Sequence, residues 1–200
     1  MNLPNKITMT RICLIPIVVL VFYLEMIPYN RSIAALLFII TALTDFIDGH
    51  LARKNNLVTN LGKFLDPIAD KVLVIVMLFL LIEAGALPSP YGAIGCSLIV
   101  ARELMIGGFR QVAAASDIVI AADKTGKIKT ITQDISIVTL LIMGDVKSLI
   151  WQDFHILCYV IFGIAVVLTV YSGFNYIVRN RQVLFPKRET GKQNSENSEE

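Results

Sequence analysis

Between two apolar segments the chain reads Asp45-Phe-Ile-Asp48-Gly49-His-Leu-Ala52-Arg53, and after eight further residues it reads Gly62-Lys-Phe-Leu-Asp66-Pro-Ile-Ala-Asp70. An aspartate at the centre of a membrane helix costs about 2.5–3.5 kcal/mol on the insertion scale. Four carboxylates beside apolar sequence therefore require compensating positive charge even near helix ends, and divalent cations supply it directly. The stretch predicts two membrane helices with a polar, metal-binding site between them.

The composition is typical of a membrane protein. Of the 200 residues 55% are hydrophobic and 17% are charged, whereas soluble domains carry roughly 25% charged residues. The apolar residues fall into blocks, several of which reach the ~20 residues of a membrane span only when polar flanking positions are included. The blocks predict an all-α, polytopic integral membrane protein with six transmembrane helices, built on Ile12–Ile27, Ser32–Thr44, Val72–Ile82, Tyr91–Ala101, Ile135–Gly144 and Phe154–Val178.

The positive residues predict the orientation of these helices. With the N-terminus in the cytoplasm, 14 lysines and arginines fall on the cytoplasmic side and only Arg31 and Lys147 fall outside, while Lys71 and Arg102 lie within helices near their cytoplasmic ends. Because positive residues are enriched in cytoplasmic loops, the count favours an N-in, C-in topology. The four aspartates then lie at the cytoplasmic face of the membrane.

The chain is expected to form one domain. We predict a single six-helix transmembrane catalytic domain over residues 1–187, followed by a polar cytoplasmic tail, residues 188–200, whose composition is typical of disorder. A short interfacial segment, Asn2–Thr10, is expected to precede the first helix. The later helices are expected at Ser32–Ala52, Leu61–Glu83, Tyr91–Phe109 with Gln111–Ala122 as a possible continuation, Ile128–Gly144 and Phe154–Val178.

The spacing of the aspartates predicts a metal site. Asp45 and Asp48 are three residues apart, and Asp66 and Asp70 are four apart, so each pair shares one face of a helix. Consecutive antiparallel helices bring the two faces together, and four carboxylates suit two Mg²⁺ or Mn²⁺ ions that clamp a phosphoryl group. The spacing also leaves open a buried carboxylate network or an Asp-lined metal transporter, although transporter sites usually lie near the membrane midplane.

Residues between the aspartates suit a nucleotide diphosphate. Gly49 and Gly62 remove side chains where a backbone approaches a ligand. Ala52 keeps the same helix face narrow, and Arg53 presents a bidentate fork to a phosphate.

The pattern D-x-x-D-G-x-x-A-R-x₈-G-x-x-x-D-x-x-x-D, with all eight fixed positions filled, resembles the signature of the CDP-alcohol phosphatidyltransferases. The resemblance implies a six-helix membrane enzyme, commonly homodimeric, that displaces CMP from a CDP-linked lipid with an alcohol and divalent metal. It implies Asp45, Asp48 and Asp66 as the principal metal ligands, and Asp70 as general base and further ligand. Gly49, Ala52 and Gly62 would line the cytidine site, and Arg53 would hold the diphosphate.

The flanks of the pattern resemble bacterial family members of the plasma membrane that use CDP-diacylglycerol as donor and sn-glycerol 3-phosphate as acceptor. The flanking segments are Asn2–Arg11, Phe64–Val72, Ala101–Glu103 with Arg110, and Gly126–Thr130. Asn5, Thr8 and Arg11 are expected at the donor diphosphate. Other acceptors remain open: phosphatidylglycerol for cardiolipin synthesis, an inositol phosphate, or serine.

A phosphorylated acceptor is a dianion and requires cations of its own. Arg110, Lys127 and Lys129, with Lys124 beside them, are candidates on the cytoplasmic side, although such residues also suit anionic lipid head groups. Arg102 is a further candidate for contact with the acceptor phosphate. Arg102 and Glu103 are adjacent, so we expect them to point in different directions and to need separate partners.

Overall fold

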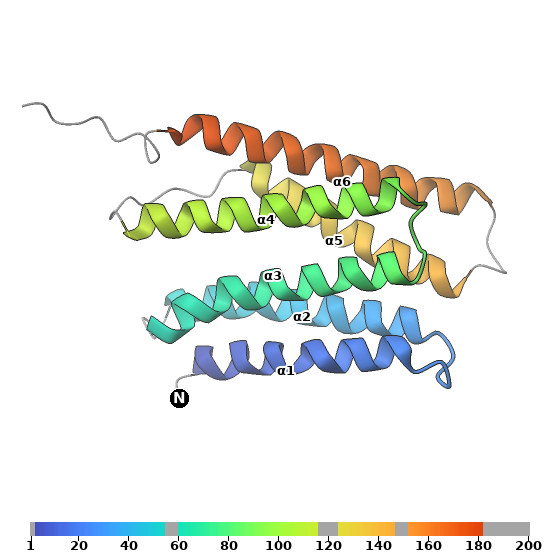
Figure 1. Cartoon of the computed structure of the whole chain (residues 1–200). Coiled ribbons are helices and arrows are strands. Elements are labelled where there is room, and N and C mark those ends of the chain that lie inside the picture. The colour runs from blue at the N-terminus through green and yellow to red at the C-terminus, as the bar shows by residue number, and fades with distance from the viewer. Residues whose placement is uncertain (1–2, 55–59, 116–123, 147–151, 182–200) are drawn as a thin grey trace, which may run out of the picture.

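The structure, a computed structural model, describes residues 3–54, 60–115, 124–146 and 152–181. Within these residues the chain forms six α-helices and no strand (Figure 1), which confirms the all-α prediction. The helices are α1 (Leu3–Tyr23), α2 (Asn30–Lys54), α3 (Asn60–Glu83), α4 (Tyr91–Ala115), α5 (Lys124–Asp145) and α6 (Gln152–Arg179).

The helix bounds differ from the predicted ones mainly at the ends. The described part of the expected interfacial segment, residues 3–10, forms the first turns of α1 and is not a separate element. Pro4 is tolerated there because the N–H groups of the first turn have no partner within the helix, so proline's missing N–H removes no hydrogen bond. α4 runs six residues beyond Phe109, in the direction of the predicted continuation. The predicted tail, residues 188–200, and the rest of that continuation, residues 116–122, lie outside the described residues.

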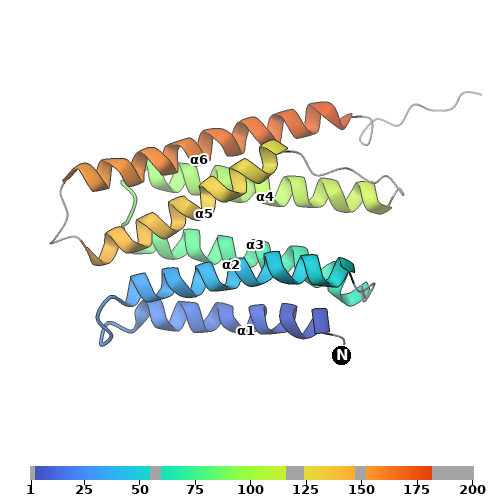
Figure 2. The ribbon, with the colours of Figure 1, turned by 180° about the vertical axis from the view of Figure 1, so that it is seen from behind.

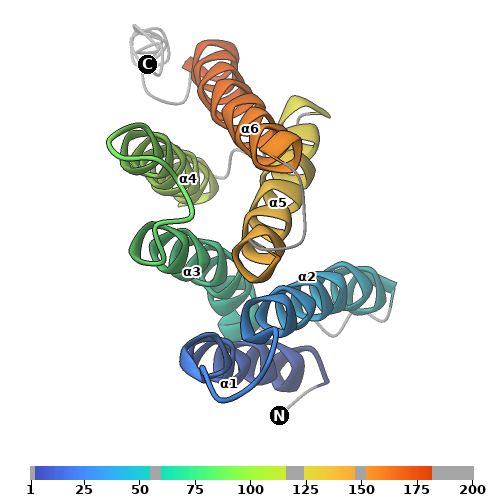
Figure 3. The ribbon, with the colours of Figure 1, turned by 90° about the vertical axis from the view of Figure 1, so that its right-hand side faces the viewer.

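The six helices run antiparallel to their neighbours in the chain (Figures 1 and 2). The C-terminal end of α2 and the N-terminal end of α3 therefore lie at the same end of the bundle as the start of α1 and the end of α6. Seen nearly end-on, α1, α2 and α3 form one group, α5 connects α2 to α6, and α4 lies beside α3 and α6 (Figure 3). The arrangement gathers both aspartate-bearing helix ends on one side of the molecule.

The opposite end of the bundle is fixed by capping contacts. Gly85 ends α3 with a φ of 61°, a left-handed conformation that glycine adopts without a Cβ penalty. The N–H groups of Gly85 and Ala86 donate to the carbonyls of Ile82 and Leu81, so the last carbonyls of α3 are satisfied. At the start of α2 the backbone N–H of Ser32 donates to Oδ2 of Asp145 at 2.6 Å, which ties α2 to the end of α5.

The bundle has an apolar core and also an apolar exterior. Val18, Phe38, Met77, Ile99 and Leu140, one from each of α1 to α5, are at most 1% exposed. Large apolar side chains also cover the outer surface, among them Leu20, Phe79, Val167 and Phe174. Several polar side chains lie inside instead: Arg11, Thr41, Lys129, Gln133, Ser136, Thr169 and Ser172. An apolar exterior around a partly polar interior fits a protein surrounded by lipid.

Two of the described helices are long and apolar enough to cross a membrane, judged by length and composition. They are Tyr91–Ala114 and Asp153–Arg179, and two shorter apolar helices cover Met9–Tyr23 and Asn30–Thr44. α5 carries charged residues along much of its length, among them Lys127, Lys129 and Asp134. α3 is also strongly apolar, from Val72 to Ile82.

Candidate functional site

The aspartates lie on the helices for which they were predicted. Asp45 and Asp48 belong to the last turns of α2, and Asp66 and Asp70 belong to the first turns of α3. Because the backbone is helical over both pairs, their spacings of three and four residues have the structural meaning assigned to them. Their side chains lie outside the described ones, so the convergence of the four carboxylates stays a prediction.

The residues predicted for the CDP-lipid come from three helices. Asn5, Thr8 and Arg11 lie on α1, while Gly49, Ala52 and Arg53 lie on α2 and Gly62 lies on α3. Arg11 is the one whose side chain is described, and it is only 4% exposed. α1 packs against both α2 and α3. A buried arginine on α1 therefore belongs to the same helix group as the aspartates.

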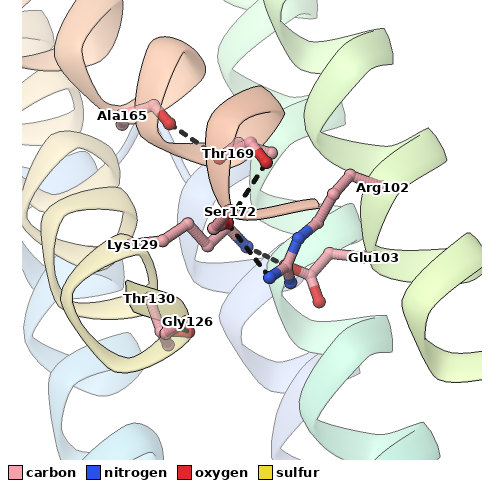
Figure 4. Close-up of polar contacts among 8 residues, drawn as sticks. All are labelled: Arg102, Glu103, Gly126, Lys129, Thr130, Ala165, Thr169 and Ser172. Atoms are coloured by element: carbon pink, nitrogen blue, oxygen red, sulfur yellow. Dashed lines mark hydrogen bonds and ion pairs between the residues drawn. The ribbon is translucent and has the colours of Figure 1, made fainter. Parts of the chain in front are cut away.

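A second group of polar residues joins α4, α5 and α6 (Figure 4). We call it the Glu103 cluster, and it consists of Arg102, Glu103, Lys129 and Ser172. Oε1 of Glu103 forms ion pairs with Nη1 of Arg102, at 3.4 Å, and with Nζ of Lys129. Arg102 and Glu103 have separate partners as expected, Ser172 for the arginine and Lys129 for the glutamate, and in addition they contact each other.

α6 holds the other side of Arg102. Nη2 of Arg102 donates to Oγ of Ser172 at 3.2 Å, and that hydroxyl donates to the backbone carbonyl of Thr169. Gly173 leaves room for the arginine stem, since a Cβ there would lie 2.9 Å from Cγ of Arg102. Nε of Arg102 is buried and has no hydrogen-bond partner among the described residues.

Arg110 makes a similar contact closer to the end of the bundle that carries the aspartates. Its Nε donates to the hydroxyl of Tyr176 at 3.1 Å, and its guanidinium carbon lies 5.3 Å from the centre of the same ring. Phe109 packs edge-on against Tyr176, with 5.7 Å between ring centres. Tyr176 follows Ser172 by one turn of α6, and Arg110 follows Arg102 by about two turns of α4. The two contacts therefore belong to the same α4–α6 interface.

The structure separates the four residues predicted for the acceptor phosphate. It joins Arg102 and Lys129 through one carboxylate and brings Arg110 to the same helix interface. Lys127 is exposed, whereas Lys129 is fully buried, because two residues along a helix turn a side chain to nearly the opposite face. Lys127 thus lies apart from the Glu103 cluster.

Sequence reasoning missed Ser172, Gly173 and Tyr176 as parts of this site. Polar residues inside the otherwise apolar α6 were a signal, but their partners lie 66 to 70 residues away in the sequence. Among the side chains that the structure describes, no three His, Cys, Asp or Glu lie together in a way that would hold a metal ion. The metal prediction thus depends on the four aspartates alone.

An apolar cavity of about 250 Å³ lies between α3 and α4. Its lining residues are Leu78, Phe79, Ile82, Cys96, Ser97, Val100 and Ala101. Ala101 immediately precedes Arg102 in the sequence, and the other lining residues lie closer to the opposite end of the bundle. Its lining suits hydrocarbon and not a charged group.

Comparison with known proteins identifies one family and relatives that share one name. The family model for CDP-alcohol phosphatidyltransferase matches residues 1–175. The chain is 41% identical over 194 residues to the CDP-diacylglycerol–glycerol-3-phosphate 3-phosphatidyltransferase of Bacillus subtilis, covering 92% of this chain and 97% of the relative. Proteins with the same name from Rickettsia bellii and Yersinia pestis are 38% and 35% identical, each covering 88% of this chain and 93% of the relative. The matched region includes the aspartate stretch and the whole Glu103 cluster.

Proposed function

Because the chain belongs to the CDP-alcohol phosphatidyltransferase family, we propose that it transfers the phosphatidyl group from CDP-diacylglycerol to sn-glycerol 3-phosphate. The products are phosphatidylglycerophosphate and CMP. The observation that carries the acceptor assignment is the gathering of Arg102 and Arg110 at the α4–α6 interface, with Lys129 of α5 paired to Glu103 of α4. An acceptor without a phosphate, such as glycerol, has no use for the buried Lys129, the half-buried Arg102 and the exposed Arg110 together, whereas a phosphate dianion is held by such a set of cations.

The helical register supports an inward-facing metal site. On α2 the buried Phe38 and Thr41 precede Asp45 by seven and four residues, spacings that keep residues on one helix face. On α3 Asp70 precedes the buried Leu73 and Met77 by three and seven residues. We therefore expect the two aspartate pairs to continue the buried faces of their helices toward the end of the bundle.

The donor set fits hard divalent cations. Asp45, Asp48, Asp66 and Asp70 offer carboxylate oxygens, the ligands that Mg²⁺ and Mn²⁺ prefer. Two ions per site are part of the proposal, and when bound they supply the positive charge that neutralises the pyrophosphate and the departing CMP.

The chain's own residues then have distinct tasks. Gly49, Ala52 and Gly62 leave room for the cytidine nucleotide. Arg53 holds its diphosphate, and Asn5, Thr8 and Arg11 of α1 contact the same group. Positioning of both reactants in this way lowers the entropic part of the barrier.

Asp70 is the proposed general base. It accepts the proton of the glycerol 3-phosphate hydroxyl as that oxygen forms a bond to the β-phosphorus, the phosphorus that carries the lipid. The bond from this phosphorus to the oxygen of CMP breaks, and CMP leaves. Arg102, Lys129 and Arg110, with Lys127 at the surface, hold the acceptor's phosphate during the transfer.

The membrane arrangement is also proposed. Six membrane-spanning helices with both termini in the cytoplasm would put the aspartates at the cytoplasmic face of the bacterial plasma membrane. The antiparallel bundle supports this, because its first and last described residues lie at the end that carries the aspartates. The apolar cavity between α3 and α4 offers space for part of an acyl chain. The homodimer implied by the family resemblance is part of the same proposal.

The test is a mixed-micelle assay of CMP release. The full-length protein is supplied with CDP-diacylglycerol and Mg²⁺ or Mn²⁺, and glycerol 3-phosphate, phosphatidylglycerol, inositol phosphate and serine are offered in turn. Release of CMP with glycerol 3-phosphate alone is the expected result, and no CMP with any acceptor would refute the enzyme assignment. Arg110→Ala distinguishes the acceptors, since only a phosphorylated one should show a clearly raised KM, and the exposed Lys127→Ala should show a smaller rise.

A further inference from the structure

Glu103 is the shared partner of two cations from different helices. Its Oε1 pairs with Nη1 of Arg102 on its own helix and with Nζ of Lys129 on α5 (Figure 4). Both Nη atoms of Arg102 are engaged, one by Glu103 and the other by Ser172. The carboxylate therefore determines where the lysine lies relative to the arginine.

The cluster is buried, so water screens the interactions between its charges only weakly. The side chains of Arg102 and Glu103 are 14% and 16% exposed, and that of Lys129 is 1% exposed. Away from water, two neighbouring cations repel each other strongly, and each loses the solvation that it had in water. One carboxylate between them offsets one positive charge and leaves one in surplus. Arg110, which is exposed at the same α4–α6 interface, adds a further positive charge toward the end of the bundle that carries the aspartates.

A carboxylate in this location has two opposite consequences for an anionic ligand. Its negative charge repels the ligand, so a purely electrostatic account expects tighter phosphate binding when Glu103 is neutralised. Its ion pairs also hold Lys129 and Arg102 at a fixed separation, so an account based on geometry expects weaker binding. The contacts favour the second account, because Lys129 is fully buried and its ammonium reaches α4 through Glu103.

We propose that Glu103 is a positioning residue for the acceptor site. It links α4 to α5, fixes the separation of the Arg102 and Lys129 cations, and leaves their surplus positive charge for the phosphate of the acceptor. The proposal rests on the proposed function for the identity of that acceptor. It concerns the geometry of the cations and assigns Glu103 no contact with substrate.

The experiment compares Glu103→Gln with Glu103→Asp in the full-length protein in detergent micelles. Glu25→Gln is the matched control, because Glu25 is exposed in the connection between α1 and α2 at the opposite end of the bundle. Three quantities are measured: kcat, the KM of each substrate, and the Kd of glycerol 3-phosphate by calorimetry. We expect Glu103→Gln to raise both the KM and the Kd of glycerol 3-phosphate by roughly tenfold, with kcat and the KM of CDP-diacylglycerol nearly unchanged.

Glu103→Asp keeps the charge and should recover most of this affinity, and Glu25→Gln should match the unaltered protein. An unchanged or lowered Kd for Glu103→Gln would overturn the proposal, as would an equal loss in kcat and in both KM values. The binding measurement separates the two levels of inference. If the protein binds glycerol 3-phosphate more weakly after Glu103→Gln but releases no CMP, the proposed function is refuted. If the enzyme is active and Glu103→Gln changes neither KM nor Kd, only the positioning role is refuted.

Discussion

Substitution of Gly173 by alanine should weaken acceptor binding without touching any charged residue. The new Cβ would lie 2.9 Å from Cγ of Arg102, too close for two carbon atoms, and Cγ is near the base of the arginine side chain. Overpacking of this kind costs about 1–3 kcal/mol, while alanine in place of glycine returns about 1 kcal/mol of helix propensity. The net loss of folding free energy is therefore small.

The effect on binding should be larger, because Arg102 must turn away from α6. It then loses its 3.2 Å hydrogen bond to Ser172 and no longer points at the acceptor's phosphate; a charge-assisted hydrogen bond to that phosphate contributes about 1.5–3 kcal/mol. The KM of glycerol 3-phosphate should rise roughly 10- to 100-fold.

Gly163→Ala is the matched control, since a Cβ at Gly163 on the same helix meets nothing within 4 Å. Steady-state kinetics with both substrates, together with thermal unfolding, give the comparison. A Gly173→Ala enzyme with the KM of the Gly163→Ala enzyme would show that the close approach of α6 to Arg102 has no role in acceptor binding.

Four further outcomes are expected. Asp70→Asn should abolish CMP release while CDP-lipid binding, measured by filter retention, persists; near-normal turnover would contradict the general-base assignment. Lys129→Met should lower the free energy of unfolding by roughly 3 kcal/mol and remove most of the acceptor affinity, because it leaves the Glu103 carboxylate without its main partner. Lys127→Met, at an exposed position, should change the free energy of unfolding by less than about 0.5 kcal/mol and the acceptor KM only a few-fold. Tyr176→Phe removes the 3.1 Å bond to Arg110 but keeps the ring, so acceptor KM should rise roughly threefold, and an unaffected KM would remove Arg110 from the site. EDTA should stop activity, and Mg²⁺ or Mn²⁺ but not Zn²⁺ should restore it; activity that survives exhaustive chelation would refute the metal assignment.

The helices and the aspartate stretch could be predicted from the sequence because their signals are local. Apolar blocks gave six helices whose bounds agree with the structure to within a few residues over most ends. The spacing of Asp45 and Asp48, and of Asp66 and Asp70, needs only helical periodicity, and both segments are helical. The structure leaves the metal ligands as a prediction, since their side chains lie outside the described ones.

The Glu103 cluster could be predicted only in part because its contacts are not local. Arg102 and Lys129 were candidates by charge, but the carboxylate that joins them lies 26 residues from Lys129. The adjacency of Arg102 and Glu103 suggested divergent directions, which holds for Cβ atoms but not for the ends of long side chains. Lys127 and Lys129 looked equivalent in the sequence, and only the packing of α5 against α6 makes one buried and the other exposed.

The residues proposed for the donor and those proposed for the acceptor lie on different helices, and this separation affects how the acceptor specificity can change. The aspartate stretch occupies the end of α2 and the start of α3, whereas the contacts of the Glu103 cluster come from α4, α5 and α6. Under the proposed assignment, substitutions on α4, α5 and α6 can therefore change which alcohol is accepted, while the aspartate stretch that binds the CDP-lipid keeps its sequence. A library that randomises the positions of Arg102, Glu103, Lys129 and Ser172 is accordingly the natural starting point for redirecting this scaffold toward new head groups.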